Sequence, residues 1–316
     1  MNHYTVSSIE KAWKFACFNH LETCEVVMDS GLNKGSSVCL TINEPGNRVP
    51  SRATNPFIPF WLSVLGMTEQ DQDANLIKKY IPEIADFRDE QNRFSLSMGA
   101  RLREFAGFDQ FRFLHETLRL GTQVLPATIF DASVDNTLQH RPSTLSLVFS
   151  ILAGRIDVMV TVDTILMHDV PFHSELSVVS MWQEMLAAYM GIRVGKMNVV
   201  CGATSAMQSD SDEFRKIVDE DTSPSRQNLS VMGTESDPEV LTSDFKTWPL
   251  VGVGRGYLSD FFKHTVIPMA MVTRALKKDG PDLHTKCEEA SQAALAIHDV
   301  AWRDHVTFWI NNYFVE

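Results

Sequence analysis

The sequence predicts a mixed α/β protein in which helices cover a sheet. Its clearest signal is a hairpin. Thr144–Leu152 is mostly apolar, Ala153-Gly154 is a turn pair, and apolar residues then alternate with polar ones from Ile156 to Asp163. This alternation is typical of a strand with one buried face. Segments with apolar residues at helical spacing lie before and after the hairpin, and they supply the helices of the predicted class.

Capping residues and turn residues place the other elements. Before the hairpin we expect a helix from its cap Ser8 to about His20, a strand over 37–42, an apolar helix over 56–67, and a helix over 109–120 that is capped by Asp109 and ended by Gly121. After the hairpin we expect an amphipathic helix over 175–190, closed by Gly191, and a strand over 198–203. These elements form a predicted core over residues 1–207.

The last third of the chain divides into two parts. Residues 208–245 are rich in Ser, Asp, Glu and Thr with little apolar periodicity, apart from a short helix signal near Phe214–Val218. We interpret them as a polar, acidic insertion on the surface that is partly mobile. Residues 246–316 are interpreted as a helical C-terminal region, because Ala290, Ala294, Ile297 and Trp302 form a face that can pack on the core.

Composition narrows the classes of function. The 316 residues carry a formal net charge of −12, so we expect no broad basic surface for nucleic acid. No apolar run is long enough to span a bilayer, and Met1–Ser8 lacks a signal-peptide core. The five cysteines form no CxxC pair, which indicates reduced thiols, a cytoplasmic location and no metal site.

Five short motifs follow one another within residues 8–207. They are Arg48-Val49-Pro50-Ser51-Arg52-Ala53-Thr54-Asn55-Pro56, Met98-Gly99-Ala100-Arg101-Leu102-Arg103 with Gly107-Phe108-Asp109-Gln110, Ala153-Gly154-Arg155-Ile156-Asp157, Pro171-Phe172-His173, and Gln183–Gly191 with Val194-Gly195. In order and spacing they resemble the thymidylate synthase family, including the phage-type pyrimidine nucleotide hydroxymethylases. The resemblance implies a thymidylate synthase-like fold, which is a twisted mixed sheet covered by helices, here with an extra helical C-terminal region.

The chain departs from that family at the nucleophile. The family uses a cysteine thiolate, placed just after a proline at the start of the strand before the hairpin, to attack C6 of the pyrimidine. In this chain Pro142-Ser143 occupies that place, and no cysteine lies within fifty residues of it. A serine hydroxyl is a much poorer nucleophile near neutral pH than a thiol. Ser143 is therefore either a serine nucleophile or simply a polar residue at the start of a strand.

Other positions of the family's site are also changed. No acidic residue lies in 53–68, where the family has a glutamate, and the positions of further family residues fall at Gln123, Val124, Val162, His173, Ser205 and Met207. The candidate replacements for ligand binding are Arg48, Arg52, Arg101 and His173. The arginines could equally be solvated surface charges, and His173 could equally be a satisfied core residue. Cys201, on a strand near the site, is a relocated nucleophile or a buried structural thiol.

Two classes of function follow from these departures. The first is a non-catalytic or repurposed relative whose cleft binds a ligand, such as a pyrimidine nucleotide, or a protein partner. The alternative is a pyrimidine nucleotide C5 methyl- or hydroxymethyltransferase with a rebuilt active site. A structural or assembly role is a further alternative. No cofactor is expected in the first case, and methylenetetrahydrofolate is implied in the second. The resemblance also implies a homodimer.

Overall fold

A computed structural model of the chain describes residues 2–26, 32–52, 54–68, 72–73, 80, 93–94, 97–104, 107–136, 142–166, 171–220, 230–232, 237–251 and 256–313. Within them, the main sheet has eight strands. Along the sheet lie β1 (Asn2–Val6), β4 (Val38–Ile42), β10 (Arg193–Met207), β9 (Arg155–Leu166), β8 (Thr144–Leu152) and β7 (Val124–Thr128). β3 (Leu32–Gly35) pairs with the far end of β10, and β2 (Glu25–Val26) pairs with β3. A separate pair joins β5 (Gln72–Asp73) to β6 (Arg93–Phe94).

The sheet is mixed, as predicted. β1 runs parallel to β4, and β9 runs parallel to β10, whereas the other neighbours are antiparallel. The predicted hairpin is confirmed as β8 and β9. Its turn places both Ala153 (φ 49°) and Gly154 (φ 71°) in the left-handed region. Two consecutive left-handed residues are typical of the tight turn that matches the twist of the flanking strands.

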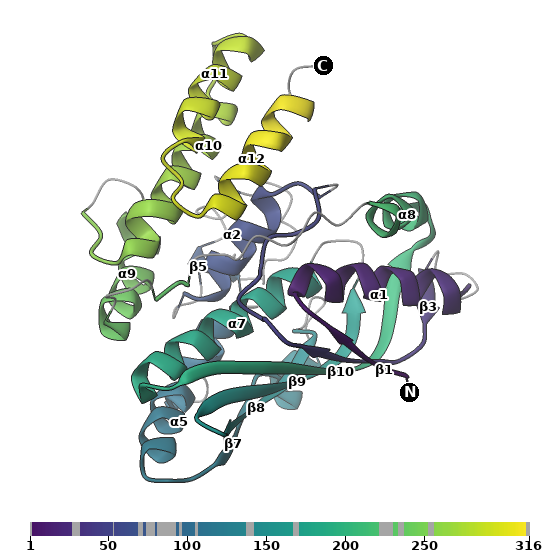
Figure 1. The fold of residues 1–316 in the computed structure, drawn as a ribbon, viewed down its shortest axis with the longest axis vertical. Coiled ribbons are helices and arrows are strands. Elements are labelled where there is room, and N and C mark those ends of the chain that lie inside the picture. The colour runs from purple at the N-terminus through teal and green to yellow at the C-terminus, as the bar shows by residue number, and fades with distance from the viewer. Residues whose placement is uncertain are drawn as a thin grey trace.

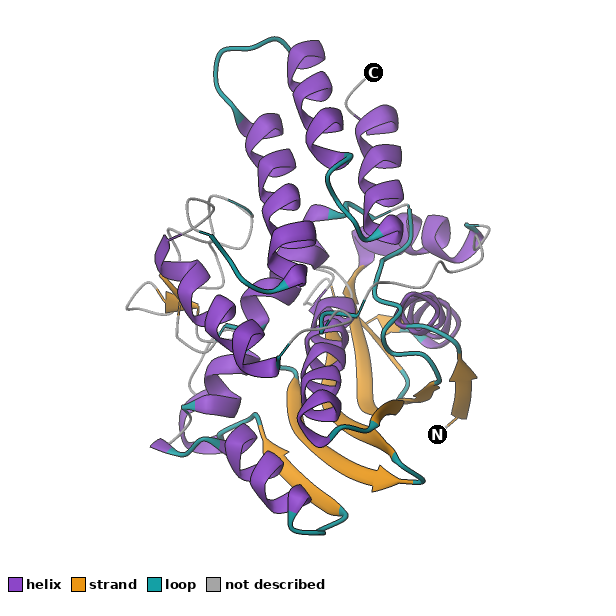
Figure 2. Cartoon of the chain, turned by 60° about the vertical axis from the view of Figure 1, so that its left-hand side comes forward, coloured by secondary structure: helices purple, strands orange, loops and turns teal. Residues whose placement is uncertain are grey.

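The described helices fall on one side of the sheet. They are α1 (Ile9–Thr23), α2 (Phe57–Gly66), α4 (Met98–Arg103), α5 (Gln110–Arg119), α6 (Ala132–Asp135), α7 (Pro171–Met190), α8 (Ser211–Asp219), α9 (Pro238–Val251), α10 (Ile267–Lys277), α11 (Leu283–Ala294) and α12 (Val300–Tyr313). α7 packs across β9 and β10, α1 lies over β3 and β4, and α5 packs on β7 (Figure 1). Neither view shows a described helix on the opposite face (Figure 2).

The predicted caps of the core helices are confirmed. Ser8 Oγ accepts the backbone N–H of Lys11 at the start of α1, and Asp109 accepts the backbone N–H of Arg112 at the start of α5. Each cap satisfies one of the N–H groups that a helix start leaves without an intrahelical acceptor.

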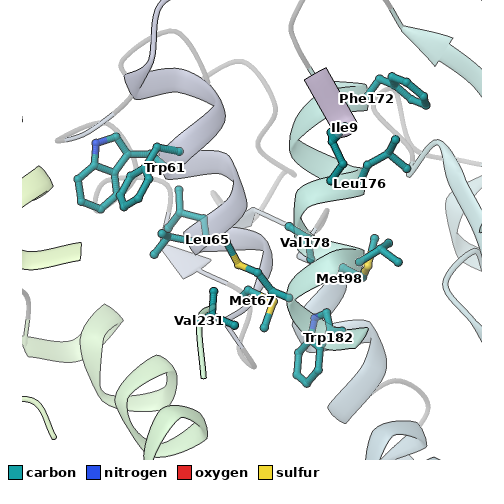
Figure 3. Packing of buried hydrophobic residues seen from close by; sticks show 14 of the residues in the cluster. Ile9, Trp61, Leu65, Met67, Met98, Phe172, Leu176, Val178, Trp182 and Val231 are labelled. Carbon is teal, nitrogen blue, oxygen red and sulfur yellow. The ribbon is translucent and has the colours of Figure 1, made fainter. Parts of the chain in front are cut away.

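The core continues from α7 through α2 into the C-terminal helices. α2 packs directly against α7, and Figure 3 shows α2, with Leu65, beside the stretch of α7 that carries Val178. Gly66 permits this approach, because a Cβ atom there would lie 2.5 Å from a methyl carbon of Val178. On its other side, α2 receives the indole of Trp302, whose ring centroid is 5.1 Å from that of Phe60. This ring contact joins α12 to α2.

Three boundaries differ from the sequence-based expectation. α7 begins at Pro171 rather than near residue 175, because a proline is well tolerated in the first turn of a helix. β10 extends over Arg193–Met207, well beyond 198–203, because two different strands pair with its two halves. α9 begins at Pro238, inside the predicted insertion, and it buries Leu241 and Phe245. Residues 221–229 and 233–236 of that insertion lie outside the described residues.

No helix in the described part of the chain combines the length and the apolar character needed to cross a bilayer. The five cysteines, Cys17, Cys24, Cys39, Cys201 and Cys287, are all free thiols.

Candidate functional site

The structure places Ser143 immediately before the start of β8, as the sequence predicted. Its backbone carbonyl accepts the N–H of Asp163, so that Ser143 is held beside β9. The next residue, Thr144, pairs with Val162, which in turn pairs with Cys201 on β10. Ser143 is therefore adjacent in the chain to the first member of a row, Thr144–Val162–Cys201, that crosses three strands.

The hydroxyl of Ser143 meets a carboxyl group that sequence reasoning missed. Ser143 Oγ donates a hydrogen bond of 2.6 Å to Oε2 of Glu175, and Thr144 Oγ1 donates one of 2.9 Å to the same oxygen. Thr144 is fully buried, whereas Ser143 and Glu175 are partly buried. We call these three residues the hydroxyl–carboxyl cluster.

Burial governs the charge of this cluster. Desolvation raises the pKa of Glu175 above its usual range, and the hydrogen bonds from Ser143 and Thr144 oppose that rise only in part. A carboxyl group with a raised pKa can hold or release a proton closer to neutral pH than an ordinary glutamate can. The cluster can therefore accept a proton from a hydroxyl and donate one to a neighbouring acceptor.

Glu175 carried one weak signal in the sequence. It lies two residues after the Pro171-Phe172-His173 motif, on the helix that the sequence predicted. Helical position alone does not reveal which strand the carboxyl group faces. Glu175 and Ser143 are 32 residues apart in the chain, and the packing of α7 on the sheet brings them into contact.

Cys201 is a buried thiol on β10. Its side chain is buried, and its thiol lies 2.9 Å from the carbonyl oxygen of Ala203. Desolvation raises the pKa of this thiol to about 11. A thiol with such a pKa is almost entirely protonated at neutral pH, so it is a poor nucleophile there.

Arg48 forms a buried ion pair with Glu184. Its guanidinium is buried and donates to Ser180 Oγ at 2.9 Å and to Glu184 Oε1 at 2.6 Å. The other carboxylate oxygen of Glu184 accepts from the hydroxyl of Ser230 and from the backbone N–H of Val231. Arg48 thus joins its loop to α7 and, through Glu184, to the 230–232 segment.

Arg101 is engaged in the same way. It makes a bidentate pair with Asp135, with two N–O distances of 2.8 Å, and it also donates to the carbonyl oxygen of Ile129. Asp135 is fully buried. This geometry is the fork that arginine forms with carboxylates, and it fixes α6 to α4.

Arg52 differs from the other two candidate arginines. Its side chain is exposed, and its guanidinium carbon lies 5.0 Å from the ring centroid of Phe308 on α12. Its backbone N–H donates to Glu220. Of the three candidates, only Arg52 presents its charge to an incoming ligand.

His173 lies in the core rather than at the surface. It is fully buried. Burial, together with the nearby imidazole of His305, lowers the pKa of His173 to about 3. His173 is therefore neutral at physiological pH. The structure does not bring it into hydrogen-bonding contact with the hydroxyl–carboxyl cluster.

Three apolar side chains from the motifs and from the neighbouring strands differ in burial. Met98 and Val162 are buried apolar side chains, whereas Val124 is 56% exposed on the edge strand β7. No group of three His, Cys, Asp or Glu side chains within the described residues is arranged to hold a metal ion.

Comparison of the chain with known proteins does not identify a family. No protein-family model matches the chain, and no curated protein matches it.

Proposed function

We propose that this chain is a thymidylate synthase-like protein that has been repurposed for binding and does not transfer one-carbon units. The observation that carries the proposal is the state of the nucleophile position. Ser143 stands where the family has its thiolate, and its hydroxyl donates to Glu175. Without a thiolate, the pyrimidine ring is not activated for attack on a one-carbon donor.

The arginines support the same proposal. Arg48 and Arg101 are committed to buried carboxylates, and each ion pair would have to break before its guanidinium could hold a phosphate. Hydrogen bonds to charged groups contribute on the order of 1.5–3 kcal/mol each, so a ligand phosphate loses several of them here. The ligand that we expect is a pyrimidine nucleotide held by Arg52 and the hydroxyl–carboxyl cluster, or a protein partner at the same place.

One observation favours the alternative, a pyrimidine nucleotide C5 methyl- or hydroxymethyltransferase with a rebuilt site. Glu175 supplies a carboxyl group with a raised pKa, which the 53–68 segment lacks. The cluster does not fit one-carbon transfer from methylenetetrahydrofolate, however, because its nucleophile is an alcohol and the nearby thiol of Cys201 is protonated. We therefore keep the binding function as the conclusion, together with the homodimer and the cytoplasmic location expected from the sequence.

Titration calorimetry with deoxyuridylate and deoxycytidylate tests the binding proposal. We expect weak binding by the natural protein and at least a fivefold loss of affinity in Arg52→Ala and in Glu175→Gln. Arg112→Ala is the matched control, because Arg112 is an exposed arginine on α5 outside this site. Unchanged affinity in both site variants would contradict the proposed nucleotide site.

A further inference from the structure

We propose that Ser143 and Glu175 form a nucleophile–base pair that reacts with esters and other activated acyl groups. This inference goes beyond the binding function, because it requires neither a nucleotide nor folate. It concerns the chemistry of the hydroxyl–carboxyl cluster itself.

The geometry meets the first requirement of an activated alcohol. The distance of 2.6 Å between Ser143 Oγ and Glu175 Oε2 lies in the range of strong hydrogen bonds from a hydroxyl to a carboxylate. A nucleophile in direct contact with its base can lose its proton as it attacks.

The base is itself oriented by a third group. Thr144 Oγ1 donates to the same carboxylate oxygen at 2.9 Å, and Thr144 is 1% exposed, so its side chain is held by the core. A base fixed by a neighbour is the arrangement that covalent catalysis uses in many unrelated proteins. Thr144 is thus a positioning residue, and Ser143 and Glu175 are the reacting groups.

The cluster is partly exposed and lies near the start of a long helix. Ser143 and Glu175 are both partly exposed, unlike Thr144. Glu175 is the fifth residue of the 20-residue helix α7, so the positive end of the helix dipole lies within about one turn of the cluster. That end favours the negative oxygen that forms when an alcohol attacks a carbonyl group.

The chemical step balances without a further cofactor. Ser143 Oγ bonds to the carbonyl carbon of an ester while its proton passes to Glu175. The bond to the leaving alkoxide then breaks, and Glu175 returns the proton to it, giving an alcohol and an acyl-serine. Water attacks the acyl-serine by the same route, which releases a carboxylic acid and restores Ser143.

An alkyl fluorophosphonate tests the pair directly, because its capture by serine needs no specific substrate pocket. Ser143 Oγ forms the new bond to phosphorus, fluoride leaves, and Glu175 takes the proton. We expect intact-protein mass spectrometry to show one adduct and peptide mapping to place it on Ser143. The adduct should disappear in Ser143→Ala and persist in Ser146→Ala, a serine on the same strand. Labelling elsewhere, or none at Ser143, would overturn the proposal.

Two further measurements separate activation from mere exposure. In Glu175→Gln, labelling should slow by about 100-fold, which is a typical contribution of a general base. In Thr144→Val, the labelling rate should rise at a higher pH than in the natural protein, because the lost hydrogen bond normally lowers the pKa of Glu175. If Glu175→Gln does not fold, the pH profile of the natural protein decides. A rate that does not depend on a group titrating below pH 8 would contradict the role of Glu175.

Discussion

Arg48 and Arg101 bind buried carboxylates, although the sequence alone allowed them to be ligand-binding residues or surface charges. Each candidate arginine lies in a motif that the sequence singled out, but the sequence does not show which carboxylate each one meets. Arg48 meets Glu184 across 136 residues, and Arg101 meets Asp135 across 34. The pairing of buried charges depends on how the helices pack, and no local pattern encodes it.

The Arg101–Asp135 pair gives a stability prediction. Asp135→Ala leaves a buried guanidinium without its bidentate partner, so we expect the free energy of unfolding to fall by about 3–5 kcal/mol. Urea denaturation followed by circular dichroism measures it. Glu116→Ala, which breaks the exposed pair with Arg112, is the control and should change nothing measurable. A loss of less than 1 kcal/mol in Asp135→Ala would contradict the structural role of Arg101.

The buried imidazoles predict how stability depends on pH. Burial lowers the pKa of His305 to about 4 and that of His173 to about 3, both from 6.5. Between pH 6.5 and each lowered pKa, the unfolded chain binds more protons than the folded chain does. The contribution of these imidazoles to the free energy of unfolding is therefore complete above pH 6.5. As the pH falls below 6.5, each imidazole lowers that free energy by roughly 1.4 kcal/mol per pH unit.

Denaturant titrations at pH 7, 6 and 5 measure this dependence. Glu175 and other carboxyl groups with raised pKa act in the opposite direction, so the comparison is with His305→Gln, which removes one imidazole. We expect a shallower loss of stability in the variant. Parallel curves for the natural protein and the variant would show that His305 does not titrate as a buried group.

Among the secondary-structure elements, the turn between β8 and β9 holds the backbone of Ala153 in a strained conformation. Ala153 adopts φ 49°, a conformation that costs residues with a Cβ about 1–2 kcal/mol, whereas asparagine tolerates it well. We expect Ala153→Asn to raise the free energy of unfolding by about 0.5–1 kcal/mol, because Asn-Gly suits this turn. Ala132→Asn, in helix α6, should not stabilise the protein. Destabilisation by Ala153→Asn would contradict the turn geometry.

The hairpin, the helix caps and the C-terminal helices were predictable because their signals are local. A turn pair, a capping side chain and an apolar period all act over a few residues. The start of α9 was not predictable, because Pro238 lies in a polar stretch and Leu241 and Phe245 gain their burial only from distant helices. The Ser143–Glu175 contact was hidden for the same reason, although the position of Ser143 was found from the motif order.

At the scale of the whole molecule, the open face of the sheet predicts the oligomeric state. Met159 on this face is 40% exposed, and Val148 and Asn198 are its cross-strand neighbours. An apolar patch on such a face is a candidate for burial by a second subunit. We expect a homodimer through this face that buries on the order of 1,600 Å² or more.

Light scattering at micromolar concentration should give about twice the chain mass of 35.6 kDa. Met159→Arg should give a monomer, while Val134→Arg, an exposed change on α6, should leave the dimer intact. A monomeric natural protein would contradict this expectation.

We propose that this site does not transfer one-carbon units to pyrimidine nucleotides. The most direct measurement is the release of tritium from C5-labelled deoxyuridylate or deoxycytidylate in the presence of methylenetetrahydrofolate. We predict no release by the natural protein, and none by Ser143→Cys, because Arg48 and Arg101 remain bound to Glu184 and Asp135 and cannot hold the phosphate. Turnover by the natural protein would contradict the claim. Turnover by Ser143→Cys alone would show that Arg52 and its neighbours hold the nucleotide without them.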